Sequence, residues 1–317
     1  MDETTPIESP PLETPARWSP ASPPGDPAPT PPAPDEERET DPRLSPTPPW
    51  RPWSAPLALV GGLVLAAVGG LIVDLPASLI FGAKVTSSYT SPGLVIIDTI
   101  VQDLGFILAA VYCAQLGVRT VRSWQFGLRR PGVGWLTAGG YVLLLLVLFV
   151  VLSVIWSGAV HPKEEELLKT LGSNEGTGLL LASAFLTCVV APICEEFLFR
   201  GYIFTALRNW KGTFPAALIT GMLFGGVHVG SAPALDLVPL AALGFGLCLL
   251  YRHTGSLYPC FVAHSLNNSI AFSSLENWSW QTPLLMVASL VGIALIVKLC
   301  KRAGLIAPSM RPAGAGT

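Results

Sequence analysis

The sequence predicts an all-α protein: a polytopic membrane bundle of about eight transmembrane helices, preceded by a disordered proline-rich tail. Of the 317 residues, 50% are hydrophobic and 13% are charged, whereas soluble domains carry roughly 25% charged residues. The mean hydropathy is +0.53. Apolar runs long enough to cross a bilayer recur from residue 55 onward. Most of the chain is therefore expected to lie in lipid.

Residues 1–54 differ sharply in composition from the rest of the chain. They hold 17 of the 30 prolines, ten of the 21 acidic residues and four of the 19 basic ones. Few apolar side chains are present to offset the entropy of ordering, and no basic start leads into an apolar run, as it would in a signal peptide. We expect an acidic cytoplasmic tail, either a solvated tether or a docking site for a proline-binding protein.

A membrane domain is expected over 55–303, followed by a short flexible tail over 304–317. Trp50 and Trp53 precede the first apolar run and are of the type found at membrane interfaces. The loop 159–176, rich in Glu and Lys, is predicted to be a solvated helix or a lid. The eight expected helices are 56–82, 93–117, 134–158, 177–208, 213–230, 234–251, 256–274 and 283–300.

The distribution of Lys and Arg predicts the orientation. With the tail in the cytoplasm, 15 of the 19 basic residues fall on the cytoplasmic side. Lys84, Lys163 and Lys169 fall in outer loops, and Arg200 falls within the membrane. The positive-inside rule then places both termini in the cytoplasm. A composition rich in Ala, Gly, Pro and Arg favours a bacterial inner membrane, and a net charge of −2 gives no reason to expect a nucleic-acid partner.

Ionisable side chains recur inside three of the apolar segments. Such groups are costly at membrane depth and are usually functional. At a rise of ~1.5 Å per residue, the three helices bring them to overlapping depths. The sequence therefore predicts a polar reaction site within the bilayer, formed by Glu195, Glu196, Arg200, His228, His264 and Asn268.

Spacing assigns different roles to the two glutamates. Glu196 and Arg200 are four residues apart with the acid first, which favours an ion pair. Glu195 points ~100° away on the helix and is less committed, so it suits general-base catalysis. Gly225 and Gly226, just before His228, are expected to let a neighbouring helix approach closely.

Two chemistries fit these residues. In one, Glu195 and His228 activate a water molecule, while His264 and Asn268 stabilise the tetrahedral oxyanion. In the other, zinc or another divalent ion, with Glu195, His228 and His264 as candidate ligands, lowers the pKa of the bound water. The chain has no HExxH motif. Its six cysteines have no CxxC spacing and are interpreted as buried apolar residues.

The pattern resembles the CAAX protease and bacteriocin-processing (CPBP, or Abi) family of intramembrane endopeptidases, which includes the type II CAAX prenyl endopeptidases. The signature region covers about 177–275, and the segments 126–131 and 252–257 look like linkers of the family. Three ordered motifs carry the resemblance: Glu195, Glu196 and Arg200; Phe224 and His228; His264 and Asn268.

The resemblance implies a glutamate-dependent membrane endopeptidase, metal-assisted or metal-free. Glu195 would be the principal acid and base and His228 its partner. The implied catalytic set is Glu195, Glu196, His228, His264 and Asn268, with Arg200 and Phe224 as structural residues at the site. The substrate would be a membrane-anchored peptide or protein, such as a CAAX-type tail or a leader peptide.

Two other functional classes are compatible with the sequence. A non-proteolytic immunity or scaffold protein could reuse the fold. A proton-coupled transporter could use buried carboxyl groups, with Asp98, Gln102 and Asp103 lining a water-filled groove. Alternatively, these three residues pack against the polar site or face a cavity mouth. The chain shows no internal repeat and no paired broken helices of the kind that transporters carry.

Overall fold

The computed structural model describes residues 48, 50–81, 92–118, 120–160 and 176–306. The predictions for the tail 1–47, the loop 161–175 and the segment beyond 306 lie outside these residues. Some basic residues used to predict the orientation also lie outside the described residues, among them Lys84, Arg119, Lys163 and Lys169.

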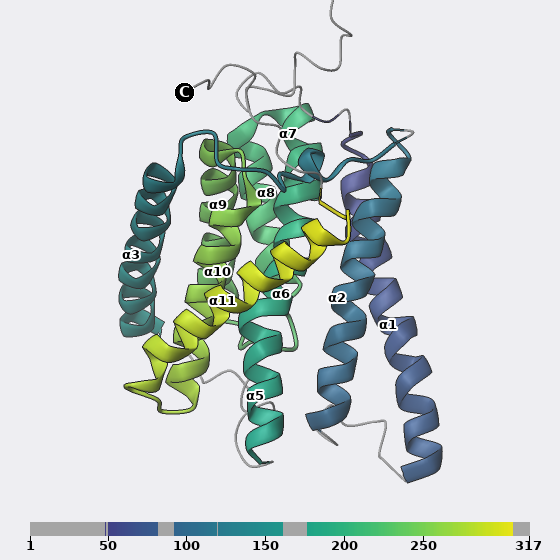
Figure 1. The fold of residues 1–317 in the computed structure, drawn as a ribbon, viewed down its shortest axis with the longest axis vertical. Coiled ribbons are helices and arrows are strands. Elements are labelled where there is room, and N and C mark those ends of the chain that lie inside the picture. The colour runs from purple at the N-terminus through teal and green to yellow at the C-terminus, as the bar shows by residue number, and fades with distance from the viewer. Residues whose placement is uncertain (1–47, 49, 82–91, 119, 161–175, 307–317) are drawn as a thin grey trace, which may run out of the picture. The chain divides into compact units, whose positions relative to one another are not determined.

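All eight expected helices are present in the described part of the chain, within a few residues of their predicted bounds. The fourth is a continuous helical run that contains two π-helical segments. Figure 1 shows their arrangement. The helices are α1 (Ser54–Phe81), α2 (Pro92–Gln115), α3 (Trp135–Val160), the run α5 (Thr177–Phe185), η3 (Leu186–Val190), α6 (Ala191–Glu196), η4 (Phe197–Phe204) and α7 (Thr205–Lys211), then α8 (Thr213–Gly226), α9 (Leu237–Thr254), α10 (Leu257–Leu275) and α11 (Gln281–Arg302).

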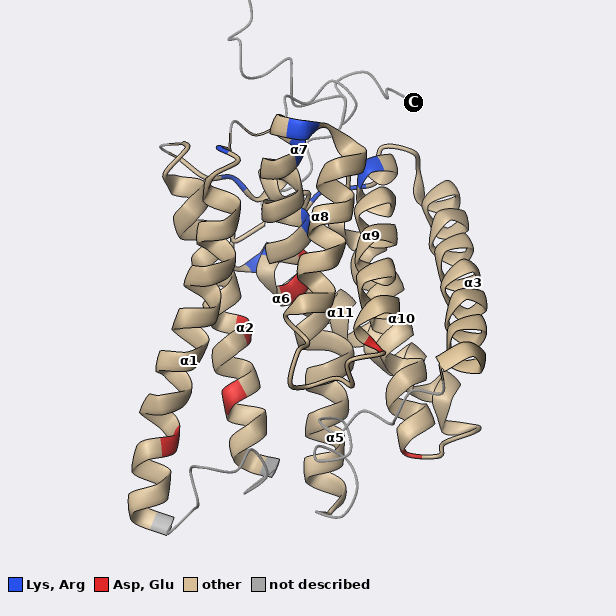
Figure 2. Ribbon diagram, turned by 180° about the vertical axis from the view of Figure 1, so that it is seen from behind, with Lys and Arg blue, Asp and Glu red and all other residues tan. Residues whose placement is uncertain are grey.

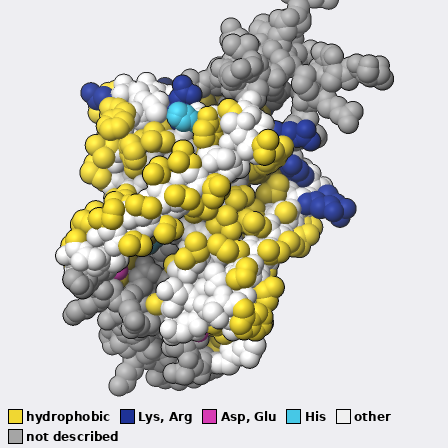
Figure 3. All heavy atoms as spheres, turned by 90° about the vertical axis from the view of Figure 1, so that its left-hand side faces the viewer, with side chains coloured by type: hydrophobic (Ala, Val, Ile, Leu, Met, Phe, Trp, Pro, Cys, Tyr) yellow, Lys and Arg dark blue, Asp and Glu magenta, His cyan; other side chains and the backbone are white. Residues whose placement is uncertain are grey.

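The lengths and exposed surfaces of these helices fit a bilayer. Six helical runs in the described residues are long and apolar enough to cross a membrane, including the 35-residue run Thr177–Lys211. Large apolar side chains such as Leu136 (93% exposed) and Val154 (67% exposed) face outward. Figure 3 shows hydrophobic side chains covering the side of the molecule formed by α3 and α11. Such a surface is stable in lipid rather than in water, so the chain is an integral membrane protein.

The run 177–211 forms the centre of the bundle, and every residue of η4 is buried. The α1–α2 hairpin packs against it on one side, and α8, α9 and α10 pack on the other. A short helix, η2 (Ser123–Phe126), leads into the 126–131 segment, which docks on 252–257. Leu257 N–H donates to Gly127 O at 2.8 Å, and Arg129 Nε–H donates to Gly255 O at 2.9 Å. The two linker-like segments of the sequence therefore meet in space.

Trp50 is not the interfacial residue that its position suggested. It is 2% exposed, and its ring lies 4.8 Å from both Phe126 and Tyr202. Asn209 Nδ2 donates to the carbonyl of Trp50 at 3.2 Å. Because aromatic partners on two other segments cover it, this tryptophan anchors the start of α1 to η4 instead of facing headgroups. Trp53 is 54% exposed, and its position at a membrane interface stays a prediction.

The fifth helix was predicted to reach residue 230, but α8 ends at Gly226. His228 therefore lies in the turn that follows. Of the two glycines, only Gly225 makes the expected close approach, since a Cβ there would lie 2.6 Å from Leu237 O of α9. A Cβ on Gly226 would meet nothing within 4 Å. Helix contact through Gly225 thus fixes the point at which the chain turns toward His228.

Candidate active site

The short helix α6, which carries both glutamates, is flanked by the π-helical segments η3 and η4. Pro192 has no N–H, so it cannot donate to the carbonyls four and five residues before it. Both carbonyls accept hydrogen bonds from α10. Asn268 Nδ2 donates to Thr187 O at 3.0 Å, and Ser265 Oγ donates to Cys188 O at 2.6 Å. These bonds fix the register of α10 against the glutamates.

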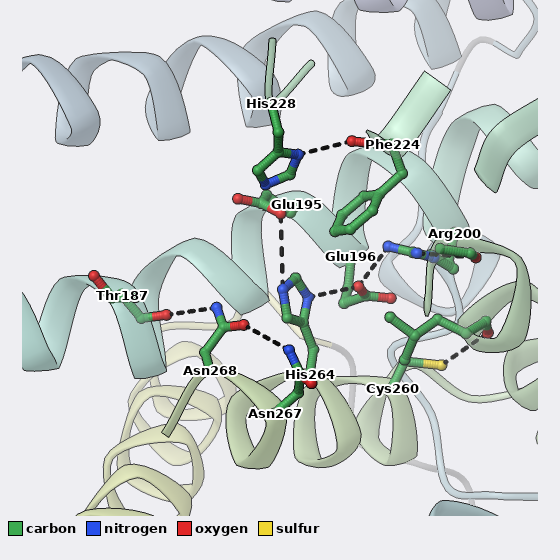
Figure 4. Close-up of polar contacts among 12 residues, drawn as sticks. Thr187, Glu195, Glu196, Arg200, Phe224, His228, Cys260, His264, Asn267 and Asn268 are labelled. Atoms are coloured by element: carbon green, nitrogen blue, oxygen red, sulfur yellow. Dashed lines mark hydrogen bonds and ion pairs between the residues drawn. The ribbon is translucent and has the colours of Figure 1, made fainter. Parts of the chain in front are cut away.

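Glu196 is the centre of a buried polar network (Figure 4). Its Oε1 accepts from Arg200 Nη1 at 2.5 Å and lies 2.8 Å from His264 Nδ1. Glu196 and Arg200 are fully buried, and His264 is 3% exposed. The ion pair predicted from the i,i+4 spacing is confirmed, and His264 is a further partner of the same carboxylate. The three side chains hold α6, η4 and α10 together.

Phe224 and Gly244 complete the surroundings of the arginine. Arg200 Nη2 donates to Gly244 O at 3.0 Å, and the guanidinium lies 4.5 Å from the centre of the Phe224 ring. The same ring packs 5.1 Å from the His228 ring and 5.6 Å from the His264 ring. Phe224 therefore contacts the buried cation and both histidines. This contact gives a physical reason for the aromatic residue of the second motif.

Glu195 lies on the other face of α6. Its side chain is 13% exposed, and its Oε2 lies 3.8 Å from His264 Nε2. That oxygen has no hydrogen-bond partner among the described residues. The His228 ring points toward the Glu195 carboxylate in Figure 4, while its Nδ1 is 2.8 Å from Phe224 O. Each histidine is thus oriented through Nδ1, which leaves Nε2 on the side of Glu195.

A cavity of about 710 Å³ brings the catalytic candidates together. Glu195, His228, His264 and Asn268 all line it, whereas Glu196 and Arg200 do not. The opposite wall comes from α1 and α2 and includes Asp98 and Gln102, as expected for a groove, but not Asp103, which is 1% exposed. The polar lining residues that sequence reasoning missed include Asp74, Thr187 and Asn267.

Glu195, His228 and His264 are the side chains that could bind a divalent ion at this site. A carboxylate and two imidazoles are suitable zinc ligands, and both Nδ1 atoms are already held by acceptors in the way that orients metal-binding histidines. No group of three or more His, Cys, Asp or Glu in the described residues is arranged to hold a metal, however. The arrangement does not fit a metal without movement of side chains, so no catalytic step is derived through one. Five cysteines are buried and Cys300 is partly exposed, all with free thiols.

Comparison with known proteins bears on the same region. Residues 177–270 match the family model "Type II CAAX prenyl endopeptidase Rce1-like", and this stretch contains the residues of the three motifs but not the cavity wall from α1 and α2. The match confirms the resemblance that the three motifs indicated. No solved structure matches the chain significantly.

Two bacterial proteins illustrate the similarity. The chain is 36% identical over 92 residues to "Putative membrane peptidase YdiL" of Bacillus subtilis, which is 29% of this chain and 36% of that protein. It is 25% identical over 181 residues to "UPF0177 protein YxdF" of Lactococcus lactis, covering 55% of this chain and 93% of the other. The chain thus spans about a third of the length of the Bacillus relative.

Proposed function

We propose that this chain is an intramembrane endopeptidase that hydrolyses a peptide bond of a membrane-anchored polypeptide. Residues 177–270 are similar to the Rce1-like type II CAAX prenyl endopeptidases. One observation carries the proposal. Glu195 lines the cavity together with His228 and His264, whereas the adjacent Glu196 lies outside the lining and is paired with Arg200 and His264. A carboxylate that faces a cavity beside two oriented imidazoles is suited to activating water.

Water attacks the scissile carbonyl as Glu195 removes one of its protons. The tetrahedral intermediate carries its negative charge on the former carbonyl oxygen. Its C–N bond then breaks, and Glu195 returns the proton to the leaving amine, so that the glutamate ends the cycle ionised. A group that acts as base and then as acid in this way contributes on the order of 10²–10⁴-fold to the rate.

The remaining residues orient the reactants. His228, held at Nδ1 by Phe224 O, positions the water against Glu195. His264, held at Nδ1 by Glu196, presents Nε2 to the cavity. Asn268 uses its amide to bond Thr187 O and has a second N–H for the developing oxyanion. Removing one such oxyanion donor typically slows catalysis by about 10²–10³-fold.

The decisive experiment measures cleavage of a membrane-anchored peptide by the purified protein in lipid. We expect Glu195→Gln to lower the rate by about 10²–10⁴-fold and to leave the unfolding temperature unchanged, because the lost oxygen has no hydrogen-bond partner in the described structure. Unchanged cleavage in this variant would refute the assignment. Activity that survives a chelator supports direct activation of water by Glu195, whereas loss that zinc restores supports metal ligation by Glu195, His228 and His264.

We also propose that the end of the bundle near α7 faces the cytoplasm of a bacterial cell. Figure 2 shows Lys and Arg gathered toward that end, and Asp and Glu elsewhere in the bundle. Under the positive-inside rule, a membrane-impermeant thiol reagent applied to spheroplasts should label Ser231→Cys. It should label Lys211→Cys only in inverted vesicles, with the wild-type chain as background for its own cysteines. The reverse labelling pattern would overturn this orientation.

A further inference from the structure

The cavity at Glu195 has an acidic lining. Three carboxyl groups line it, from Asp74 in α1, Asp98 in α2 and Glu195 in α6, and no Lys or Arg is present in its described lining. One oxygen of Asp98 is buried without a hydrogen-bond partner in the described structure. Arg200, a cation of the same region, is fully buried behind Phe224 and already paired with Glu196 and Gly244 O. The cavity therefore offers a ligand several negative charges and no compensating positive side chain of Lys or Arg.

This charge pattern bears on which end of a polypeptide the cavity can accept. A C-a-a-X tail ends in a free carboxylate close to its cysteine. Two like charges ~8 Å apart repel by about 2 kcal/mol at an effective dielectric constant of 20. A carboxylate that follows the scissile bond into this cavity would meet such repulsion from more than one side. An amide or a continuing chain at the same position would not.

The cavity also extends away from the basic end of the molecule. Ser54, at the start of α1, is anchored near that end by a 2.7 Å hydrogen bond with Tyr202. Asp74 follows twenty residues later in the same helix, which is ~30 Å along its axis. A bound segment would therefore run from Glu195 toward the end remote from α7, where acidic rather than basic residues line its path.

We infer that the cavity accepts an internal, uncharged or basic segment of a membrane-anchored polypeptide and discriminates against a chain end that carries a free carboxylate. The inference rests on the proposed endopeptidase function and names its substrate class. Under it, the CAAX-type tail is the poorer substrate, and an internal bond, as in the removal of a leader segment, is the better one.

The test compares three peptides of one farnesylated C-a-a-X sequence. One ends in the free carboxylate, one ends in an amide, and one continues into a short Gly/Ser extension. Cleavage is measured with the full chain in neutral lipid vesicles at pH 8. We expect the amide and the extended peptide to be cleaved at least about tenfold faster than the carboxylate form, because only the latter brings a further negative charge among the acids.

A matched pair of variants isolates the cause. Asp98→Asn should bring the rate for the carboxylate peptide closer to that for the amide, whereas Asp236→Asn, outside the cavity lining, should leave the ratio unchanged. A carboxylate peptide cleaved as fast as the amide overturns the inference and leaves the proposed function standing. Cleavage of none of the peptides counts against the proposed function itself, and the inference falls with it.

Discussion

The two faces of α6 carry the same side chain in opposite circumstances. Glu196 is fully buried and is shared by Arg200 and His264, which come from η4 and α10. Glu195, one residue earlier, faces a cavity and has no Lys or Arg partner among the described residues, where its nearest ion-pair contact is His264 Nε2 at 3.8 Å. The Glu196 carboxylate, neutralised by Arg200, holds helices together, and the Glu195 carboxylate, which faces the cavity, can exchange a proton with a bound water. A turn of ~100° between neighbouring residues separates the two roles.

The largest effect that this comparison predicts is on stability. Arg200→Ala should destabilise the fold by about 3–5 kcal/mol, because it leaves the buried Glu196 carboxylate without its cation. Unfolding of the detergent-solubilised protein, followed by circular dichroism against temperature, measures the loss. Lys211→Ala is the matched control, since Lys211 is exposed at the end of α7. Equal unfolding temperatures for the two variants would show that the Glu196 network does not hold the bundle together.

The contrast between the two faces was partly visible in the sequence. The Glu196–Arg200 pair is local, so helical periodicity alone predicted it. The contacts of Glu196 with His264 and of Arg200 with Gly244 O join residues 68 and 44 positions apart. No local rule specifies such pairs, although apolar segment lengths did place all the helices that carry them.

Proline and glycine residues indicate helix irregularities and helix ends that hydrophobic periodicity does not reveal. Pro192 in the middle of a long apolar segment marked the change of helical pitch, because a proline cannot complete the backbone ladder there. The Gly225–Gly226 pair marked the end of α8, which leaves His228 in a turn. The cavity wall from α1 and α2 depends on how the hairpin packs, so Asp74 could not be assigned to the site from spacing alone.

Asn268 and Ser265 provide a finer test, because they make similar bonds from the same helix but differ in their access to the cavity. Each donates a hydrogen bond to a backbone carbonyl to which Pro192, having no N–H, cannot donate. Only Asn268 lines the cavity. We expect Asn268→Ala and Ser265→Ala each to cost about 1–3 kcal/mol of unfolding free energy, since each deprives a carbonyl of its side-chain donor.

Their effects on cleavage should differ even though their effects on stability are similar. Asn268→Ala should also slow cleavage by about 10²–10³-fold through loss of an oxyanion donor, whereas Ser265→Ala should retain most of the activity below its unfolding temperature. The rate of each variant is measured at the same margin below its own unfolding temperature. This comparison separates the loss of stability from the loss of oxyanion stabilisation. If the two variants lose activity equally, Asn268 acts only by fixing the register of α10, and oxyanion stabilisation falls to His264.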